Sequence, residues 1–260
     1  MTRPDQSQAP ARDAICYEDI YTVEYANKRD VEFFRNRLAD QHCERILEVG
    51  CGTGRVYEAL RDLDPQPSYV GIDYSRSALK YFSERHPEAE TIEGFFPDCL
   101  STKIEHDFDA VMFSFNGLSY MPDKRRPEFF DGCQRVLHER GRMLLHFFRF
   151  DPARLILAHQ PEAFVKEFDV NGLTVGKYIA TRMMDDVEPN ATRRTFSYRF
   201  SDANGPGEIV KVFDVFQCHS ERIFEQIRAA GFTEITLFSD PYATGYDAAA
   251  DDVYLEARLG

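Results

Sequence analysis

The chain has 260 residues, 43% of them hydrophobic, and a formal net charge of −13 at pH 7. This length supports one large domain or a core with an elaborated insert. The acidic balance disfavours a protein that coats nucleic acid, because that role normally needs a basic surface. No apolar run approaches the ~20 residues of a membrane span, and the polar N-terminal stretch lacks the apolar centre of a signal peptide. We therefore expect a cytoplasmic protein whose partners are neither nucleic acid nor a membrane.

Short apolar runs alternate with helical segments from residue 45 to about residue 150. This is the pattern of a parallel sheet with crossover helices. The predicted strands are Arg45–Val49, Ser68–Asp73, Glu90–Glu93, Phe108–Phe115 and Arg142–Phe148. The predicted helices between them are Arg55–Leu63, Arg76–Glu84 and Arg125–Glu139, and a turn at Glu139–Arg142 leads into the fifth strand.

The pattern changes after Asp151, where extended runs follow one another without helices between them. Turn-rich sequences separate three predicted strands, Leu173–Met184, Thr192–Ser201 and Glu208–Gln217. A helix at Ser220–Ala230 and two last strands, Glu234–Phe238 and Val253–Ala257, then return to the main sheet. The predicted fold is α/β: a Rossmann-like, doubly wound, mostly parallel seven-stranded sheet with an antiparallel β insert after the fifth strand.

The first predicted strand runs into a loop with glycines at alternate positions, Ile46-Leu-Glu-Val-Gly-Cys-Gly-Thr-Gly54. Gly50 and Gly52 let the backbone turn sharply and approach a ligand without an intervening side chain, and the following helix presents free N–H groups to it. A dinucleotide fingerprint would place another glycine where this chain has Arg55. Glu48 would repel a phosphate but attract the ammonium group of an amino acid. The loop therefore predicts a nucleoside ligand that carries an amino acid, the alternative being a loop that only turns the chain.

The second predicted strand ends in a carboxylate, Tyr69-Val-Gly-Ile-Asp73. An acid at this place in such a fold suits hydrogen bonds from both hydroxyls of a ribose. Charge-assisted bonds of this kind contribute about 1.5–3 kcal/mol. The alternative is that Asp73 only caps the helix that opens near Ser75.

Three motifs together, Glu48-Val-Gly-Cys-Gly-Thr-Gly54, Gly71-Ile-Asp73-Tyr-Ser75 and Phe108-Asp109-Ala-Val111, resemble those of class I S-adenosylmethionine-dependent methyltransferases. The resemblance covers about residues 44–150 and implies S-adenosylmethionine as the cofactor. It places the methionine part against the glycine loop, the ribose on Asp73, and the adenine against the loop Gly94–Asp98, where the contact falls on Phe96 or Asp98. The cofactor-binding residues that it implies are Tyr17, Glu48, Gly50, Cys51, Gly52, Gly54, Asp73, Tyr74, Phe96, Asp98, Ser114 and Phe115.

In this family the segment after the fourth strand faces the methyl group, and here it reads Phe113-Ser-Phe-Asn-Gly-Leu-Ser-Tyr-Met121. It lacks the Asn/Asp-Pro-Pro-Tyr sequence of enzymes that methylate base amines or glutamine. The chain also lacks the acidic cluster of the catechol-type enzymes, so we predict no metal. The order of elements resembles N-methyltransferases that act on nucleotide-linked amino sugars. We therefore predict methyl transfer to a small molecule, at an amine nitrogen. The alternatives are small-molecule O-methylation, a non-catalytic cofactor-binding protein, and a nicotinamide-dependent oxidoreductase.

A neutral amine needs only to arrive unprotonated, whereas a hydroxyl needs a base within hydrogen-bond reach. The catalytic candidates near the predicted mouth are Tyr120, His146 and Tyr21. The alternatives are that His146 is a core histidine and that Tyr120 is a packing residue of its loop. If the acceptor carries phosphate, we expect at least one arginine near or on the insert to line the pocket, from the set Arg149, Arg154, Arg193, Arg194 and Arg199.

These interpretations divide the chain into four parts. Residues 1–43 form a tail and a helix that resembles the cofactor lid of small-molecule methyltransferases. Residues 44–150 form the cofactor-binding core, residues 151–219 the insert, and residues 220–260 the closing helix and last two strands. The insert is expected to roof a pocket for the acceptor, or alternatively to form the surface of a homodimer.

Overall fold

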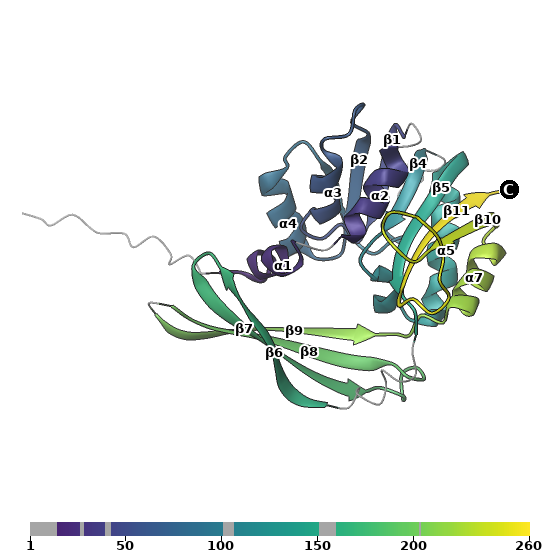
Figure 1. Ribbon diagram of the computed structural model, residues 1–260. Coiled ribbons are helices and arrows are strands. Elements are labelled where there is room, and N and C mark those ends of the chain that lie inside the picture. Colours follow the sequence, from purple (N-terminus) through teal and green to yellow (C-terminus); the bar gives the residue numbers. More distant parts are fainter. Residues whose placement is uncertain (1–14, 27–28, 40–42, 101–106, 151–159, 203) are drawn as a thin grey trace, which may run out of the picture.

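The computed structural model describes residues 15–26, 29–39, 43–100, 107–150, 160–202 and 204–260. A seven-stranded sheet flanked by helices forms the main body, and a four-stranded sheet lies apart from it, beneath helix α1 (Figure 1). The strands of the main sheet are β1 (Arg45–Val49), β2 (Ser68–Asp73), β3 (Glu90–Glu93), β4 (Phe108–Phe113), β5 (Leu137–Phe148), β10 (Phe232–Phe238) and β11 (Asp252–Leu259). The helices are α1 (Tyr17–Tyr25), α2 (Asp30–Ala39), α3 (Arg55–Leu60), α4 (Arg76–Arg85), η2 (Gly117–Tyr120), η3 (Asp123–Arg125), α5 (Arg126–Val136) and α7 (Ser220–Ala229).

The main sheet has the strand order β10-β11-β5-β4-β1-β2-β3. The strands from β5 to β3 pair in parallel, and β11 pairs antiparallel with both β5 and β10. The prediction of a mostly parallel, doubly wound sheet is confirmed. The chain reverses its direction of strand addition between β1 and β4, and ligands bind beyond the carboxyl ends of the strands at such a switch point.

Both faces of the main sheet are buried, because successive side chains of a strand point to opposite faces. On one face Leu47 belongs to a core with Phe129 of α5 and Ile223 of α7. On the other face Ile46 belongs to a core with Phe33 of α2. Among the described residues, no helix is long and apolar enough to cross a membrane.

Several boundaries in the core differ from the prediction. Strand β4 ends at Phe113 rather than Phe115, because Phe115 and Asn116 have φ angles of 47° and 60° that no strand adopts. Helix α5 ends at Val136, and β5 begins at once with Leu137, which pairs with Phe108. The turn predicted at Glu139–Arg142 is therefore wrong, since these residues lie inside β5.

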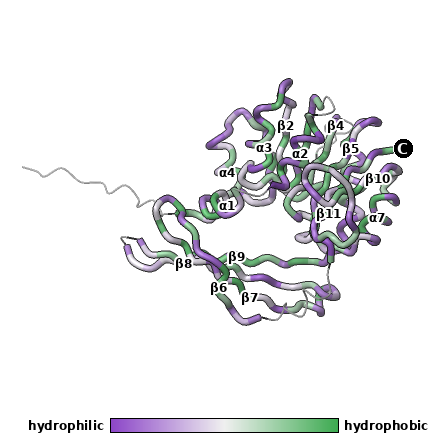
Figure 2. Tube along the Cα trace, viewed as in Figure 1, coloured by the Kyte–Doolittle hydropathy of each residue, from purple (hydrophilic) through white to green (hydrophobic). Residues whose placement is uncertain are grey.

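The insert is an antiparallel sheet of four strands rather than three: β6 (Gln160–Val170), β7 (Leu173–Met183), β8 (Thr192–Asp202) and β9 (Gly205–Val215). The sequence did not predict β6 because residues 160–167 are all exposed, which removes the alternation of buried and exposed positions. In β9 partly buried and exposed residues do alternate, and hydrophobic residues mark much of this strand in Figure 2.

Helix α1 packs between the two sheets. Its Ile20 is fully buried in a small core with Val170, Val175 and Tyr198 of the insert. The helix also contacts α4 of the main body. The segment predicted as a lid helix is therefore a helix that contacts both the main body and the insert (Figure 1).

Candidate functional site

A cavity of about 870 Å³ lies beyond the carboxyl ends of β1, β2 and β4. The insert forms its opposite wall: Thr192, Arg194 and Phe196 of β8 line it, as do their β9 partners Val215, Phe213 and Lys211. The cavity thus joins the switch point of the main sheet to one face of the insert.

The glycine loop forms one wall of this cavity, and two of its glycines, Gly52 and Gly54, have different roles. Gly50, Gly52 and Gly54 have φ angles of 68°, 53° and 86°, which favour glycine. A Cβ on residue 54 would stand 2.6 Å from the ring of Phe82, so Gly54 permits helix packing and does not line the cavity. For residue 52, no described atom lies within 4 Å of the Cβ position. Gly52 therefore offers bare backbone to a ligand, as the sequence predicts, whereas Gly54 acts through packing.

Two alanine substitutions separate these roles. Gly54→Ala is expected to lower the free energy of unfolding by about 1–3 kcal/mol more than Gly52→Ala, because only the former overpacks the core. Both variants share the strain of a left-handed residue. Denaturant unfolding measures the difference, and equal destabilisation would contradict the assignment of Gly54 to packing.

Asp73 lies at the end of β2, is 9% exposed and lines the cavity. Its Oδ2 accepts a hydrogen bond from the backbone N–H of Gly52 at 2.9 Å, and its Oδ1 accepts one from that of Ser75 at 2.7 Å. The N-cap of α4 is Ser75, whose side chain accepts from the N–H of Ala78. Burial raises the pKa of Asp73 above its usual range. The carboxylate thus holds two loops together at the cavity wall.

Glu48 is the second acid of the wall and is only 1% exposed. The hydroxyl of Tyr69 donates to its Oε2 at 2.5 Å, and that of Ser114 donates to its Oε1 at 3.4 Å. Burial raises the pKa of Glu48 to about 8. A cation brought beside this carboxyl group would favour its charged form.

Arg55 is a cavity residue that the sequence analysis did not select. Its guanidinium donates two hydrogen bonds to the carboxylate of Asp30, at 2.8 and 2.7 Å, and lies 4.8 Å over the ring of Phe115. It lines the same cavity as Glu48. The site thus holds an acid and a fixed cation, which suit the ammonium and carboxylate of an amino acid. The sequence signal for this role is the position of Arg55 directly after the glycine loop. In the sequence analysis that position served only to exclude a dinucleotide fingerprint, which requires a glycine there.

The loop after β3 provides an aromatic part of the wall. Phe96 is 5% exposed and lines the cavity. Phe95 also lines it and stacks on Tyr74 at a centroid distance of 5.0 Å. Asp98 lies outside the cavity, where it forms an ion pair with Arg125 at 2.9 Å. Of the two residues predicted to contact adenine, only Phe96 lines the cavity and stays a candidate. Asp98 is a surface residue.

Tyrosines close the cavity between the glycine loop and the insert. Tyr17, Tyr21 and Tyr25 of α1 line it, and Tyr25 packs against Phe115 at a centroid distance of 4.8 Å. Tyr120 lines it from η2 and packs on Phe213 at 5.6 Å. Burial raises the pKa of Tyr21 to about 12, so this group orients an acceptor better than it deprotonates one.

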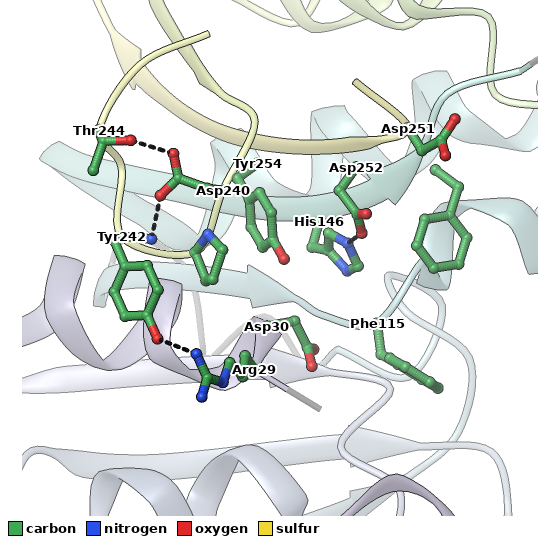
Figure 3. A pocket seen from close by; sticks show the side chains of 12 residues that line it. Arg29, Asp30, Phe115, His146, Asp240, Tyr242, Thr244, Asp251, Asp252 and Tyr254 are labelled. Atoms are coloured by element: carbon green, nitrogen blue, oxygen red, sulfur yellow. Dashed lines mark hydrogen bonds and ion pairs between the residues drawn. The ribbon is translucent and has the colours of Figure 1, made fainter. Parts of the chain in front are cut away.

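His146, predicted as a catalytic candidate, lines a different cavity (Figure 3). Its side chain is 2% exposed, stacks on Tyr254 at a centroid distance of 4.6 Å, and shares a hydrogen bond of 2.9 Å with Asp252. It points to the face of β5 opposite to Leu145. His146 is therefore placed as a core histidine and not as a base at the cofactor cavity.

The remaining residues of the cofactor prediction, Cys51, Ser114 and Phe115, line the larger cavity. Of the arginines considered for the acceptor pocket, Arg149 and Arg194 line this cavity. Arg193 pairs with Asp214, and Arg199 pairs with Glu162 and Glu208. Arg154 lies outside the described residues.

The core of the chain resembles known proteins. Residues 46–141 match a family model described as a methyltransferase domain. The chain is 29% identical over 119 residues to the demethylmenaquinone methyltransferase of Thermotoga maritima, a match that covers 45% of this chain and 48% of that protein. The chain thus spans about half the length of this curated relative.

Solved structures match over nearly the whole chain. DesVI of Streptomyces venezuelae has a TM-score of 0.73 at 18% identity and covers 95% of this chain and 99% of its own. The sugar N-methyltransferase KedS8 of Streptoalloteichus has a TM-score of 0.73 at 17% identity and covers 100% of this chain and 99% of its own. The family match thus identifies a methyltransferase domain at residues 46–141, and the whole chain shares its fold with these solved structures.

Proposed function

We propose that this chain transfers a methyl group from S-adenosylmethionine to an amine nitrogen of a small molecule. The observation that carries this proposal is the pair of buried acids, Glu48 and Asp73, which line the same cavity as the bare backbone of Gly52. Glu48 would receive the ammonium group, Arg55 the carboxylate and Asp73 the ribose hydroxyls. When bound, the cofactor supplies an electrophilic sulfonium methyl group.

The chemistry of the cavity favours nitrogen over oxygen as the acceptor atom. A hydroxyl needs a base, and burial raises the pKa values of Tyr21 and Tyr120, two of the hydroxyl groups that line the cavity. An amine needs only to be held in line with the methyl group, and such positioning can supply roughly 7–11 kcal/mol of the barrier. Tyr21 and Tyr120 would orient the amine, and closure by α1 would exclude water.

Basic side chains that line the cavity support an acceptor that carries negative charge, such as a nucleotide-linked amino sugar. Arg149, Arg194 and Lys211 line the cavity with Thr192, whose buried Oγ1 has no hydrogen-bond partner among the described residues. Guanidinium groups bind phosphate by paired, charge-assisted hydrogen bonds. KedS8, which this chain resembles in fold, is a sugar N-methyltransferase, and this supports the proposal. We also propose the four-part division of the chain given above, with residues 151–219 as the acceptor-binding insert.

Calorimetry with S-adenosylmethionine and S-adenosylhomocysteine tests the cofactor, and mass spectrometry of amino-sugar nucleotides and simple amines tests methyl transfer. We expect binding of both nucleosides and a mass gain of one methyl group on an amine. Absence of binding would contradict the proposal as a whole. Methylation of hydroxyl acceptors alone would replace nitrogen by oxygen.

Arg194→Ala is expected to raise the acceptor KM about tenfold or more, because a charge-assisted bond contributes about 1.5–3 kcal/mol. Arg199→Ala is its matched control, since Arg199 lies on the same strand but pairs with Glu162 and Glu208 outside the cavity. Steady-state kinetics with saturating cofactor measures both. An unchanged acceptor KM in Arg194→Ala would contradict a charged acceptor.

A further inference from the structure

Helix α1 is fixed to the insert by a buried cluster of charged and polar side chains. The side chain of Glu24 is 2% exposed, and that of Lys177 is 6% exposed. The ammonium of Lys177 donates to Glu24 Oε1 at 2.6 Å, and the hydroxyl of Tyr198 donates to Glu24 Oε2 at 2.9 Å. Lys166 forms a second ion pair with Glu24 at 3.1 Å. One carboxylate of α1 therefore joins residues from β6, β7 and β8.

The same cluster lies directly behind the aromatic wall of the cavity. The ammonium of Lys177 is 4.4 Å from the ring centre of Phe196 and 5.6 Å from that of Tyr25. It also donates to the hydroxyl of Tyr25 at 3.3 Å. Both rings line the cavity. A shift of the ion pair would therefore move the rings that face the ligand.

Helical geometry connects Glu24 to the three tyrosines of α1. Tyr17, Tyr21 and Tyr25 are four residues apart, so they lie along one face of the helix. Glu24 is the neighbour of Tyr25, and its hydrogen bonds fix the rotation of the helix about its axis. Since buried ion pairs often add little net stability compared with apolar residues of similar size, the directional bonds of Glu24 serve orientation more than stability.

We propose that Glu24 and Lys177 are positioning residues, which couple the lid helix to the insert and so set the tyrosine face against the cofactor. This inference rests on the proposed function, because it assigns the tyrosine face to a bound nucleoside. The insert thereby affects cofactor binding as well as acceptor binding, through a contact that lies outside the cavity.

Glu24→Gln is expected to weaken the affinity for S-adenosylhomocysteine about tenfold, within the usual range of coupling between sites. It should also speed hydrogen exchange of the α1 amides in the absence of ligand. The double variant Glu24→Leu/Lys177→Met replaces the pair with apolar residues, so its melting temperature should return to the wild-type value. Its affinity should stay weakened, because the directional bonds are still missing. Arg199→Ala, which breaks ion pairs on the outer side of the same sheet, should leave affinity and exchange unchanged.

Calorimetry, thermal unfolding and exchange mass spectrometry separate the outcomes. Wild-type affinity in Glu24→Gln, or in the double variant, would overturn the positioning role. If affinity and melting temperature changed together in all variants, the ion pair would act only on stability, and this result would also overturn the positioning role. If the wild-type chain binds no nucleoside, the proposed function fails. Exchange of α1 still decides in that case, because unchanged exchange in Glu24→Gln refutes the coupling.

Discussion

Asp73→Ala is expected to lower the affinity for S-adenosylmethionine at least about a hundredfold. The substitution removes the acceptor for two ribose hydroxyls, and each charge-assisted bond contributes about 1.5–3 kcal/mol. It also removes the bonds from the N–H groups of Gly52 and Ser75, which hold the glycine loop beside the cavity. Both effects weaken cofactor binding. The loss of affinity should therefore exceed the loss caused by replacing any other single carboxylate of the site.

Calorimetry on purified wild-type and Asp73→Ala proteins measures this effect. Asp98→Ala is the matched control, because Asp98 is an acid of the neighbouring loop that pairs with Arg125 outside the cavity. Its affinity should equal that of the wild type. Equal affinity of Asp73→Ala and wild type would remove the ribose assignment.

The affinity for the cofactor is expected to rise with pH between about 6 and 8. Burial raises the pKa of Glu48 to about 8, so its carboxyl group is mostly neutral at pH 6 and becomes charged as pH approaches 8. A bound ammonium group favours the charged form, so binding releases a proton in this window. The slope is at most about tenfold per pH unit. In Glu48→Gln the affinity should be weak and independent of pH over the same range.

The stability of the unliganded protein should change with pH in the opposite direction. The pKa of Glu48 is higher in the folded chain than its usual 4.5. A carboxyl group whose pKa is higher in the folded chain stabilises the fold fully when the pH is below its pKa in the unfolded chain. This stabilisation is lost as the pH rises through its pKa in the folded chain. Glu48→Gln should therefore flatten the fall in unfolding free energy between about pH 4.5 and 8. Denaturant unfolding measures it, and parallel slopes in the two proteins would contradict a buried, protonated Glu48.

The strands of the main sheet could be predicted closely because their apolar runs are short and bounded by turn residues. Strands β1, β2 and β3 begin and end where the sequence indicates. The errors fall where the pattern is ambiguous. Glu139–Arg142 has the composition of a turn, yet it lies inside β5, where the pairing with β4 is irregular between Leu137 and Arg142. Strand β6 carries exposed side chains along most of its length and is defined only by its partner β7.

The candidate site shows the same division between local and long-range information. Gly52, Glu48 and Asp73 are adjacent to strand ends, so a local motif suffices to bring them to the cavity. Asp98 and His146 also lie near strand ends, but each pairs with a residue that is distant in sequence, Arg125 and Asp252 respectively. Neither side chain lines the larger cavity. Arg55 was missed for a related reason, because its orientation depends on Asp30 in another helix.

The two walls of the cavity come from separate stretches of the chain. The glycine loop and the carboxylates lie within residues 48–75, and the opposite wall lies within residues 179–218. Under the proposed function, substitutions of cavity-lining residues of the second wall, away from the ion pair of Glu24 and Lys177, can therefore alter which compound is accepted while the first wall keeps its ligand. In such an arrangement, substitutions confined to the insert sheet can change acceptor specificity. Engineering of new acceptor specificities should therefore start from the cavity-lining positions of β7, β8 and β9.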